Sequence, residues 1–414
     1  MHKQIDRFIL FMDTVTSKLP PSNNVKTTII SFVAFTFIGY VTIGLTLAVL
    51  PVFIHDQLGF SALTAGVVIS LQYVTTFLCR GFAGNIVDKK GPRLSVLIGM
   101  IAFAISGLLL FVAWLLKDHP ALSLSVLVCT RLMTGIGEGF IGASPINWAI
   151  LATDESHMGK AISFNGIASY GGIAVGAPLG VALQDISGLH IISLLILLLA
   201  FTGWMFAKRK PDLRATSDVP RQSFINVFKT VLPFGVSLAL GGIGFGAIST
   251  FITLYFSFLH WSGAVICLSL FSSMFIIGRL LFEKQIALQG GLRVATVCFL
   301  VETAGLVLLW IANTPLVAMA GAALTGFGFS LTFPALGVEA VKTTPASSKG
   351  AALACYGLFI DLSLGATGPL VGTVAGHMGI NYIYPFTTLI VFTGLVATYI
   401  LQHKKQPREL AGLT

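Results

Sequence analysis

Apolar runs long enough to cross a lipid bilayer recur along the whole chain, and they restrict the fold more than any other feature of the sequence. A spanning helix needs about 20 mostly apolar residues. Twelve such runs can be delimited, at 27–53, 61–85, 93–116, 121–151, 161–184, 188–207, 228–257, 263–287, 292–312, 316–341, 350–375 and 380–401. A hydrophobic fraction of 55%, a charged fraction of 10% and a mean hydropathy of +0.90 exclude a soluble domain of 414 residues. The sequence therefore predicts an all-α integral membrane protein with twelve transmembrane helices.

Lys and Arg are distributed unevenly between the two sides of the predicted bundle. Both tails and the even-numbered loops carry nearly all of them outside the spans, whereas the opposite side carries Lys117 alone. Short loops rich in Lys and Arg remain in the cytoplasm, so we expect both termini to be cytoplasmic. The net charge of +9 then reflects topology. It does not indicate nucleic-acid binding, which would need the charges on one folded basic domain.

A polar stretch at 207–222, AKRKPDLRATSDVPRQ, divides the spans into two groups of six. We expect a cytoplasmic segment at 1–26, a bundle at 27–207, a linker at 208–227, a second bundle at 228–401 and a cytoplasmic tail at 402–414. At an offset of 191 residues, Gly135, Gly159 and Pro178 of the first half fall on Gly326, Gly350 and Pro369 of the second half. This internal repeat predicts two pseudo-symmetric six-helix bundles.

Small residues recur at every fourth position of the fifth predicted span. Gly172, Gly176 and Gly180 form one smooth helix face, interrupted by Pro178, on which another backbone can approach closely. A helix of this kind can pack tightly and bend, as a rocking bundle requires. Ordinary helix packing without motion explains the same glycines equally well.

The segment GNIVDKKGPR, at 84–93, resembles the signature between helices 2 and 3 of the major facilitator superfamily. The resemblance extends over nearly the whole chain and implies the fold of that family. In the family this segment acts as a latch between the two bundles, a role that the resemblance assigns here to Gly84, Asp88, Gly91 and Arg93. The second half departs from the pattern, because Ala287 stands where the first half has Asp88.

Two further stretches are similar to particular branches of that superfamily. RLMTGIGEG, at 131–139, resembles the helix 4 pattern of proton-linked drug antiporters, and GGIAVGAPLG, at 171–180, is similar to their helix 5 motif except that Ala177 separates Gly176 from Pro178. TGFGFSLTFPALGVEAV, at 325–341, and GATGPL, at 365–370, look like bacterial sugar-efflux permeases. These resemblances imply a monomeric secondary transporter of the bacterial cytoplasmic membrane that exports a small organic molecule, such as a drug, a sugar-like compound or a metallophore, in exchange for protons. The alternative is a proton symporter that imports a metabolite.

Arg131, Glu138, Glu302 and Asp361 are charged residues that lie well inside predicted spans, away from the span ends at the cytoplasmic surface. An ionised group at the bilayer centre costs at least about 2.5 to 3.5 kcal/mol, so such groups usually face a polar interior and have a function there. Arg131 and Glu138 lie two turns apart on one helix face, about 10.5 Å along its axis, which is too far for direct contact. A carboxyl group balanced between burial and a nearby arginine can bind and release a proton near neutral pH. The alternatives are a fixed counter-ion role for Arg131 and a bond to a neighbouring span for Glu302.

Several polar or amphipathic residues within the spans are candidates to line a central cavity, although a structural hydrogen bond between helices is an equal alternative for each. They are Tyr40, Asn147, Trp148, Asn165, Tyr170 and Tyr356. Arg80 and Arg279 lie nearer the cytoplasmic surface, where they could simply snorkel. Arg279 could also pair locally with Glu283, one turn away.

Sequence patterns for other functions are missing. The chain has no phosphate-cradling glycine loop followed by Lys-Ser or Lys-Thr, no HExxH or GxSxG motif and no metal-ligand spacing among its five cysteines. We therefore expect no cofactor, no metal site and no enzymatic activity. A membrane enzyme or a receptor that does not transport is the competing class.

Overall fold

The computed structural model describes residues 25–142, 144–153, 157–214, 224–344 and 349–411. Within these ranges the regular secondary structure is helical, and twelve helical segments are long and apolar enough to cross a membrane. The predicted all-α fold with twelve spans is therefore confirmed. The predicted segment at 1–26 and the centre of the predicted linker lie mostly outside the described residues.

Six spans form the first half of the chain. Their elements are α2 (Val25–Leu47) with α3 (Val49–Val52) and the π-helix η2 (Phe53–Gln57), α4 (Ala62–Lys90), α5 (Pro92–Leu115), α6 (Pro120–Ile141) with α7 (Ser144–Thr153), α8 (Met158–Ser187) and α9 (Leu189–Arg209). Proline at the first position of α5 and α6 suits a helix start, because its missing N–H would have no intrahelical partner there. Gly91, at φ +87°, makes the turn between α4 and α5.

The second half repeats this plan. Its elements are α10 (Phe224–Phe258), α11 (Ala264–Gln289), α12 (Gly291–Trp310), α13 (Pro315–Phe329) with α14 (Thr332–Lys342), α15 (Lys349–His377) and α16 (Ile383–Ala411), the last preceded by the short η5 (Ile380–Tyr382). The fourth span of each half is broken at a similar place, between α6 and α7 and between α13 and α14. Pro178 and Pro369 lie inside α8 and α15, the corresponding fifth spans. Helix α16 continues ten residues past position 401, where the predicted tail begins.

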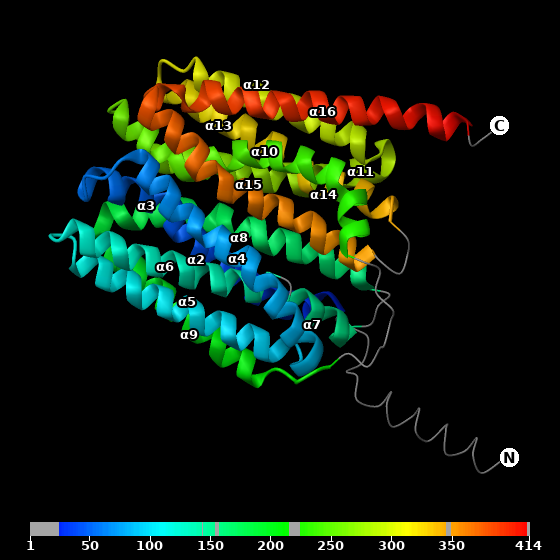
Figure 1. The fold of residues 1–414 in the computed structure, drawn as a ribbon, viewed down its shortest axis with the longest axis horizontal. Coiled ribbons are helices and arrows are strands. Elements are labelled where there is room, and N and C mark those ends of the chain that lie inside the picture. Colours follow the sequence, from blue (N-terminus) through cyan, green and yellow to red (C-terminus); the bar gives the residue numbers. More distant parts are fainter. Residues whose placement is uncertain (1–24, 143, 154–156, 215–223, 345–348, 412–414) are drawn as a thin grey trace, which may run out of the picture.

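Contacts between helices define the two predicted bundles (Figure 1). In the first, α2 packs against α8, and α5 packs against α6 and α9. In the second, α10 packs against α15, and α12 packs against α13 and α16. The bundles meet chiefly through α4 against α15 and α8 against α11. The repeat relates α4 to α11 and α8 to α15, so these two contacts are counterparts, as a pseudo-twofold axis requires.

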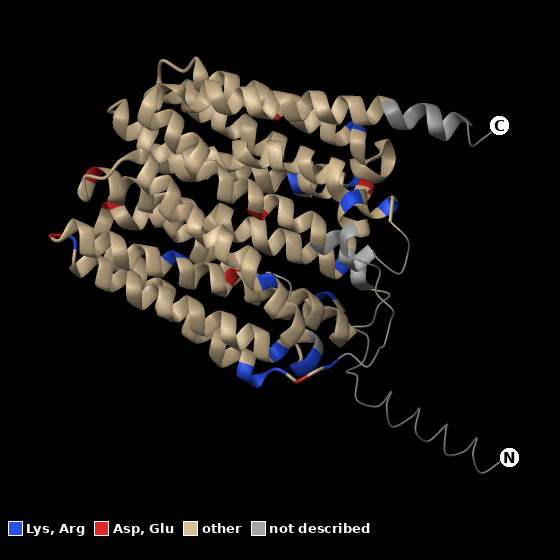
Figure 2. Cartoon of the chain, in the orientation of Figure 1, with Lys and Arg blue, Asp and Glu red and all other residues tan. Residues whose placement is uncertain are grey.

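The Lys and Arg residues are concentrated at one end of the molecule (Figure 2). We call this the basic end; it carries the α4–α5 turn with Lys89 and Arg93, the end of α9 with Lys208, and the α11–α12 turn with Lys284 and Arg293. The opposite end carries the turn between η2 and α4. Between the two ends, charged residues are few, and most of those within the spans are buried.

Candidate functional site

A hydrogen-bonded network of five side chains lies inside the first bundle, on α2, α4 and α6. Arg131 donates through Nη1 to Thr46 Oγ1 at 2.8 Å and through Nη2 to Gln72 Oε1. The amide nitrogen of Gln72 donates to Glu138 Oε2 at 2.7 Å, and the Thr76 hydroxyl donates to the same oxygen at 3.0 Å. Arg131 and Glu138 do not touch each other, as expected from their spacing, but Gln72 connects them.

Glycines of α6 permit this arrangement. A methyl group added at Gly135 would collide with the carbonyl oxygen of Gln72, and one at Gly139 would lie 2.8 Å from Cβ of Cys79. Helix α4 therefore lies close against α6 between Arg131 and Glu138. All five members of the network are buried, with Arg131 at 0% and Glu138 at 3% exposure. Buried charges of this kind are tolerated when they are hydrogen-bonded and paired.

An ion pair joins the two bundles next to this network. Arg80 on α4 contacts Asp361 on α15 through Nε to Oδ2 at 2.6 Å and donates from Nη2 to Oδ1 at 2.9 Å. Arg80 does not snorkel to the surface, because its guanidinium turns inward and forms an ion pair, with one hydrogen bond, to a carboxylate that is 4% exposed. The Arg80 guanidinium lies beside α6, with Nη1 3.4 Å from the position of a Cβ atom added at Gly142, one turn after Glu138. The network and the ion pair therefore form one polar site that spans the junction between the bundles.

An aromatic cluster occupies the other junction, between α8 and α11. Tyr170 contacts the rings of Phe275 at 5.6 Å and Phe333 at 5.4 Å, and the guanidinium of Arg279 lies 5.6 Å from the Tyr170 ring centre. Arg279 is 8% exposed and lies against Gly166 of α8. Snorkelling is therefore wrong for this arginine too, since a glycine in the facing helix admits it to the interior. The Glu283 side chain lies outside the described parts of the structure.

Glu302 lies within the second bundle, away from that polar site. It projects from α12 toward Gly241 and Gly244 of α10 and is 0% exposed. Neither carboxyl oxygen has a hydrogen-bond partner among the described residues. The predicted bond from Glu302 to a neighbouring span is therefore not formed in this conformation.

The six polar and amphipathic candidates occupy different surroundings. Trp148 is fully buried, stacks on Phe35 and donates to the carbonyl of Pro211, so it packs in the first bundle near the linker instead of lining a cavity. Tyr356 is likewise buried, with its hydroxyl on the carbonyl of Phe333. The remaining candidates lie nearer the junctions or the surface. Asn165 accepts from the Thr36 hydroxyl, Tyr40 is half-buried and packs against Gly172 of α8, and Asn147 is exposed.

Among the described residues, the segment predicted as a latch makes its contacts within the first half of the chain and at the start of the linker. Arg93 donates to the backbone carbonyl of Lys208, within the first half. A methyl group added at Gly84 would meet nothing within 4 Å, and the Asp88 side chain lies outside the described parts of the structure.

The glycine face of α8 lies against α2. A methyl group added at Gly172 would be 2.8 Å from Tyr40, and one at Gly176 would be 2.5 Å from the Val41 carbonyl oxygen. A methyl group at Gly180 would collide with the Leu45 carbonyl.

The seam between α4 and α15 is closed toward the opposite end and open toward the basic end. Gly66 and Gly368 are in backbone contact, and Gly372 lies against Ala62. On the same helix faces, one turn beyond the Arg80–Asp361 pair, Gly84 and Gly357 each have open space around the position of a Cβ atom. The hydrogen bonds from Thr253 to the Ala48 carbonyl and from Ser257 to Asp56 add further contacts between the bundles at the closed end.

Two linked six-helix bundles with buried charges at their junction define a polytopic membrane transporter. The model of the Major Facilitator Superfamily matches residues 32–288, and the chain belongs to that family. An uncharacterized MFS-type transporter of Burkholderia mallei (strain SAVP1) is 46% identical over 400 residues, which cover 95% of this chain and 97% of that protein. One from Pseudomonas aeruginosa (strain UCBPP-PA14) is 50% identical over 386 residues, covering 93% and 95%.

Solved structures share the fold at low sequence identity. A nucleoside transporter superposes with a TM-score of 0.72 at 15% identity, covering 90% of this chain and 99% of that chain. A D-xylose-proton symporter gives a TM-score of 0.71 at 15% identity, covering 90% and 96%. The predicted membership of the superfamily is thus confirmed.

Proposed function

We propose that this protein is a proton-coupled secondary transporter of the bacterial cytoplasmic membrane, with both termini in the cytoplasm, and that it exports a small organic molecule in exchange for protons by alternating access. Glu138 and Asp361 are the proton-binding groups, and Arg131, Arg80 and Gln72 set their environment. The protein acts as a monomer of two bundles, 27–207 and 228–401, joined by the linker at 208–227.

The observation that carries this proposal is that Arg80, which is paired with Asp361 of the second bundle, lies beside the turn of α6 that carries Glu138. Its Nη1 atom is 3.4 Å from the position of a Cβ atom added at Gly142, one turn after Glu138. Protonation of Asp361 removes its charge-assisted bonds to Arg80 and so weakens the seam between α4 and α15. Protonation of Glu138 removes the negative charge that faces that pair. Loading either acid therefore changes the balance between seam closure and opening, which is the coupling that a proton-driven transporter requires.

Replacing Glu138 with Gln provides the first test of this proposal. The amide preserves an acceptor for Gln72 and Thr76 but cannot release a proton, so we expect a folded protein without proton-coupled transport. Ligands are first selected from a panel of organic cations, anions and sugars by their thermal stabilisation of the purified protein. Uptake of a selected ligand is then followed in proteoliposomes under imposed pH gradients of both signs.

Glu302→Gln is the matched control. Because Glu302 lies outside the polar site, transport by this variant should still depend on the imposed pH gradient. Unchanged coupling in Glu138→Gln would remove Glu138 from the mechanism. The direction of the gradient that drives accumulation separates export from import. Proton symport is the second candidate function, because Ala177 interrupts the motif that resembles the one in antiporters.

A further inference from the structure

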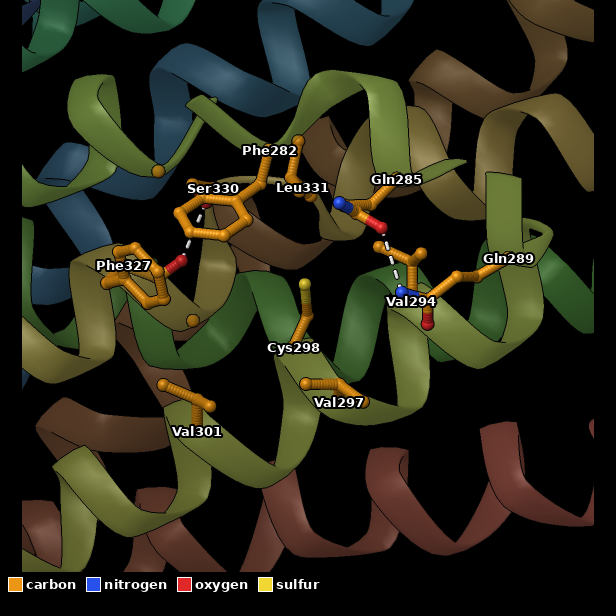
Figure 3. A pocket seen from close by; sticks show the side chains of 12 residues that line it. Phe282, Gln285, Gln289, Val294, Val297, Cys298, Val301, Phe327, Ser330 and Leu331 are labelled. Carbon is orange, nitrogen blue, oxygen red and sulfur yellow. Dashed lines mark hydrogen bonds between the residues drawn. The ribbon is translucent and has the colours of Figure 1, made fainter. Parts of the chain in front are cut away.

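A pocket of about 300 Å³ lies on the side of the second bundle, between α11, α12 and α13 and away from the polar site. Figure 3 shows Phe282 and Phe327 facing the α12 side chains Val297 and Cys298 across this space. The mouth opens laterally, because Phe282 is 40% and Val297 is 53% exposed. Their outward neighbours Leu281 and Leu300 are also exposed, as expected of a surface that faces acyl chains.

The pocket is elongated along the helix axes and changes in polarity along its length. Its lining on α12 runs from Val294 to Val301, two turns or about 10 Å. The deep part is apolar. The part nearest the α11–α12 turn presents Gln285 and Gln289, whose amides are hydrogen-bonded to each other at 2.8 Å (Figure 3). A helix axis in a membrane protein lies within a few tens of degrees of the bilayer normal, so the polar end of the pocket is at a membrane surface and the apolar end is in the hydrocarbon.

Basic residues flank the polar end. Lys284 precedes Gln285 on α11, and Arg293 precedes Val294 on α12; both are exposed and lie at the basic end of the molecule. Glu339, on α14, is already bonded to the Gly291 N–H and Lys342 in this region. The mouth therefore has two cationic side chains at headgroup depth, next to a mostly apolar pocket of about 300 Å³.

We propose that this pocket binds one acyl chain of an anionic phospholipid, with the phosphate held by Lys284, Arg293 and the Gln285 amide. The order of groups along the pocket favours this occupant. Basic side chains, then amides, then apolar side chains match the phosphate, the glycerol esters and the acyl chain of such a lipid. Clusters of Lys and Arg beside the cytoplasmic leaflet recognise anionic lipids in the same way. This inference is independent of the transported substrate.

The position of the pocket gives the lipid a structural role. Ser330 and Leu331, which separate α13 from α14, form part of its wall, and Gly278 of α11 lies against Ser330. A bound acyl chain packs directly on the break in this span. Occupancy therefore stabilises the bent arrangement of α13 and α14 seen here.

Native mass spectrometry of the purified protein, incubated with phosphatidylglycerol or phosphatidylcholine of identical acyl chains, tests the proposal. We expect one phosphatidylglycerol to be retained in preference to phosphatidylcholine. Val301→Phe fills the deep end and should abolish that retained lipid. The adjacent Leu300→Phe adds a ring of the same kind on the lipid-facing side of α12 and should leave retention unchanged.

The charge contribution is tested separately in Lys284→Gln and Arg293→Gln. Each should reduce the preference for phosphatidylglycerol by about fivefold, as expected for roughly one juxtamembrane cationic contact. The control Lys89→Gln with Lys90→Gln removes two charges at the basic end of the other bundle and should have no effect. Equal lipid retention in Val301→Phe and Leu300→Phe, or no headgroup preference in the unmodified protein, overturns the proposal. If Val301→Phe does not fold, Val301→Leu supplies the same comparison.

Discussion

The side chain of Gln72 has a role that few other residue types could fill. Its amide oxygen accepts from Arg131 and its amide nitrogen donates to Glu138, so one group satisfies a cation and an anion that cannot reach each other. A carboxylate in its place would accept but not donate, and an aliphatic side chain would do neither. The charge separation within α6 thus depends on a neutral residue of α4.

Replacing Gln72 with Leu should lower the free energy of unfolding, because Arg131 and Glu138 would each lose a buried partner. The expected cost is about 1 to 3 kcal/mol for each unsatisfied group. The melting temperature of the purified protein measures it. Thr75→Val is the matched control on the same helix, since the Thr75 hydroxyl bonds only to the carbonyl of Leu71. Equal melting temperatures for the two variants would show that the network does not stabilise the fold.

At the scale of elements, α8 and α2 are the closest pair in the first bundle, and their contact is made of backbone. Gly172, Gly176 and Gly180 follow one another at four-residue intervals along α8. Gly44 of α2 lies against the same helix: a methyl group added at Gly44 would be 2.8 Å from the carbonyl oxygen of Ile173. Such contact allows two helices to pack by dispersion forces without large side chains.

Gly180→Ala should destabilise the protein by about 1 to 3 kcal/mol, because the new methyl group collides with the carbonyl of Leu45 and α8 must shift. Gly171→Ala, on the same helix, meets nothing within 4 Å and should be neutral or stabilising by up to about 1 kcal/mol through helix propensity. Thermal unfolding in detergent at one pH compares them. A destabilised Gly171→Ala beside an unaffected Gly180→Ala would contradict this account of the packing.

For the whole molecule, the twelve spans and their pairing into two bundles could be predicted from apolar run lengths and the repeat, because hydrocarbon thickness fixes span length. The intramembrane charges Arg131 and Glu138 could also be found from composition. The partner of Arg80 could not, since Asp361 lies 281 residues away and helix rotation decides which faces meet. The surroundings of Trp148 could not be predicted for a related reason: an amphipathic residue near a span end can face the linker as well as a cavity.

The seam between α4 and α15 relates these residues to the conformation of the molecule. The two helices are in backbone contact at Gly66 and Gly368, are joined further along by the Arg80–Asp361 ion pair, and leave open space at Gly357. In the proposed orientation, with both termini in the cytoplasm, this arrangement is closed to the outside. Alternating access requires a second state in which Gly66 and Gly368 separate while the α4 and α15 segments at the basic end become enclosed.

Gly66→Trp should therefore shift the population toward that second state, because an indole cannot fit against the Gly368 backbone. The readout is the rate at which a charged, water-soluble maleimide labels Gly357→Cys in a background whose native Cys79, Cys129, Cys267, Cys298 and Cys355 are replaced by Ser. Labelling should be fast in the parent, since Gly357 faces open space, and several times slower with Gly66→Trp. Gly81→Trp adds the same side chain to α4 where nothing lies within 4 Å and should leave the rate unchanged. Equal labelling in all three proteins would mean that closure at one end and opening at the other are not coupled through this seam.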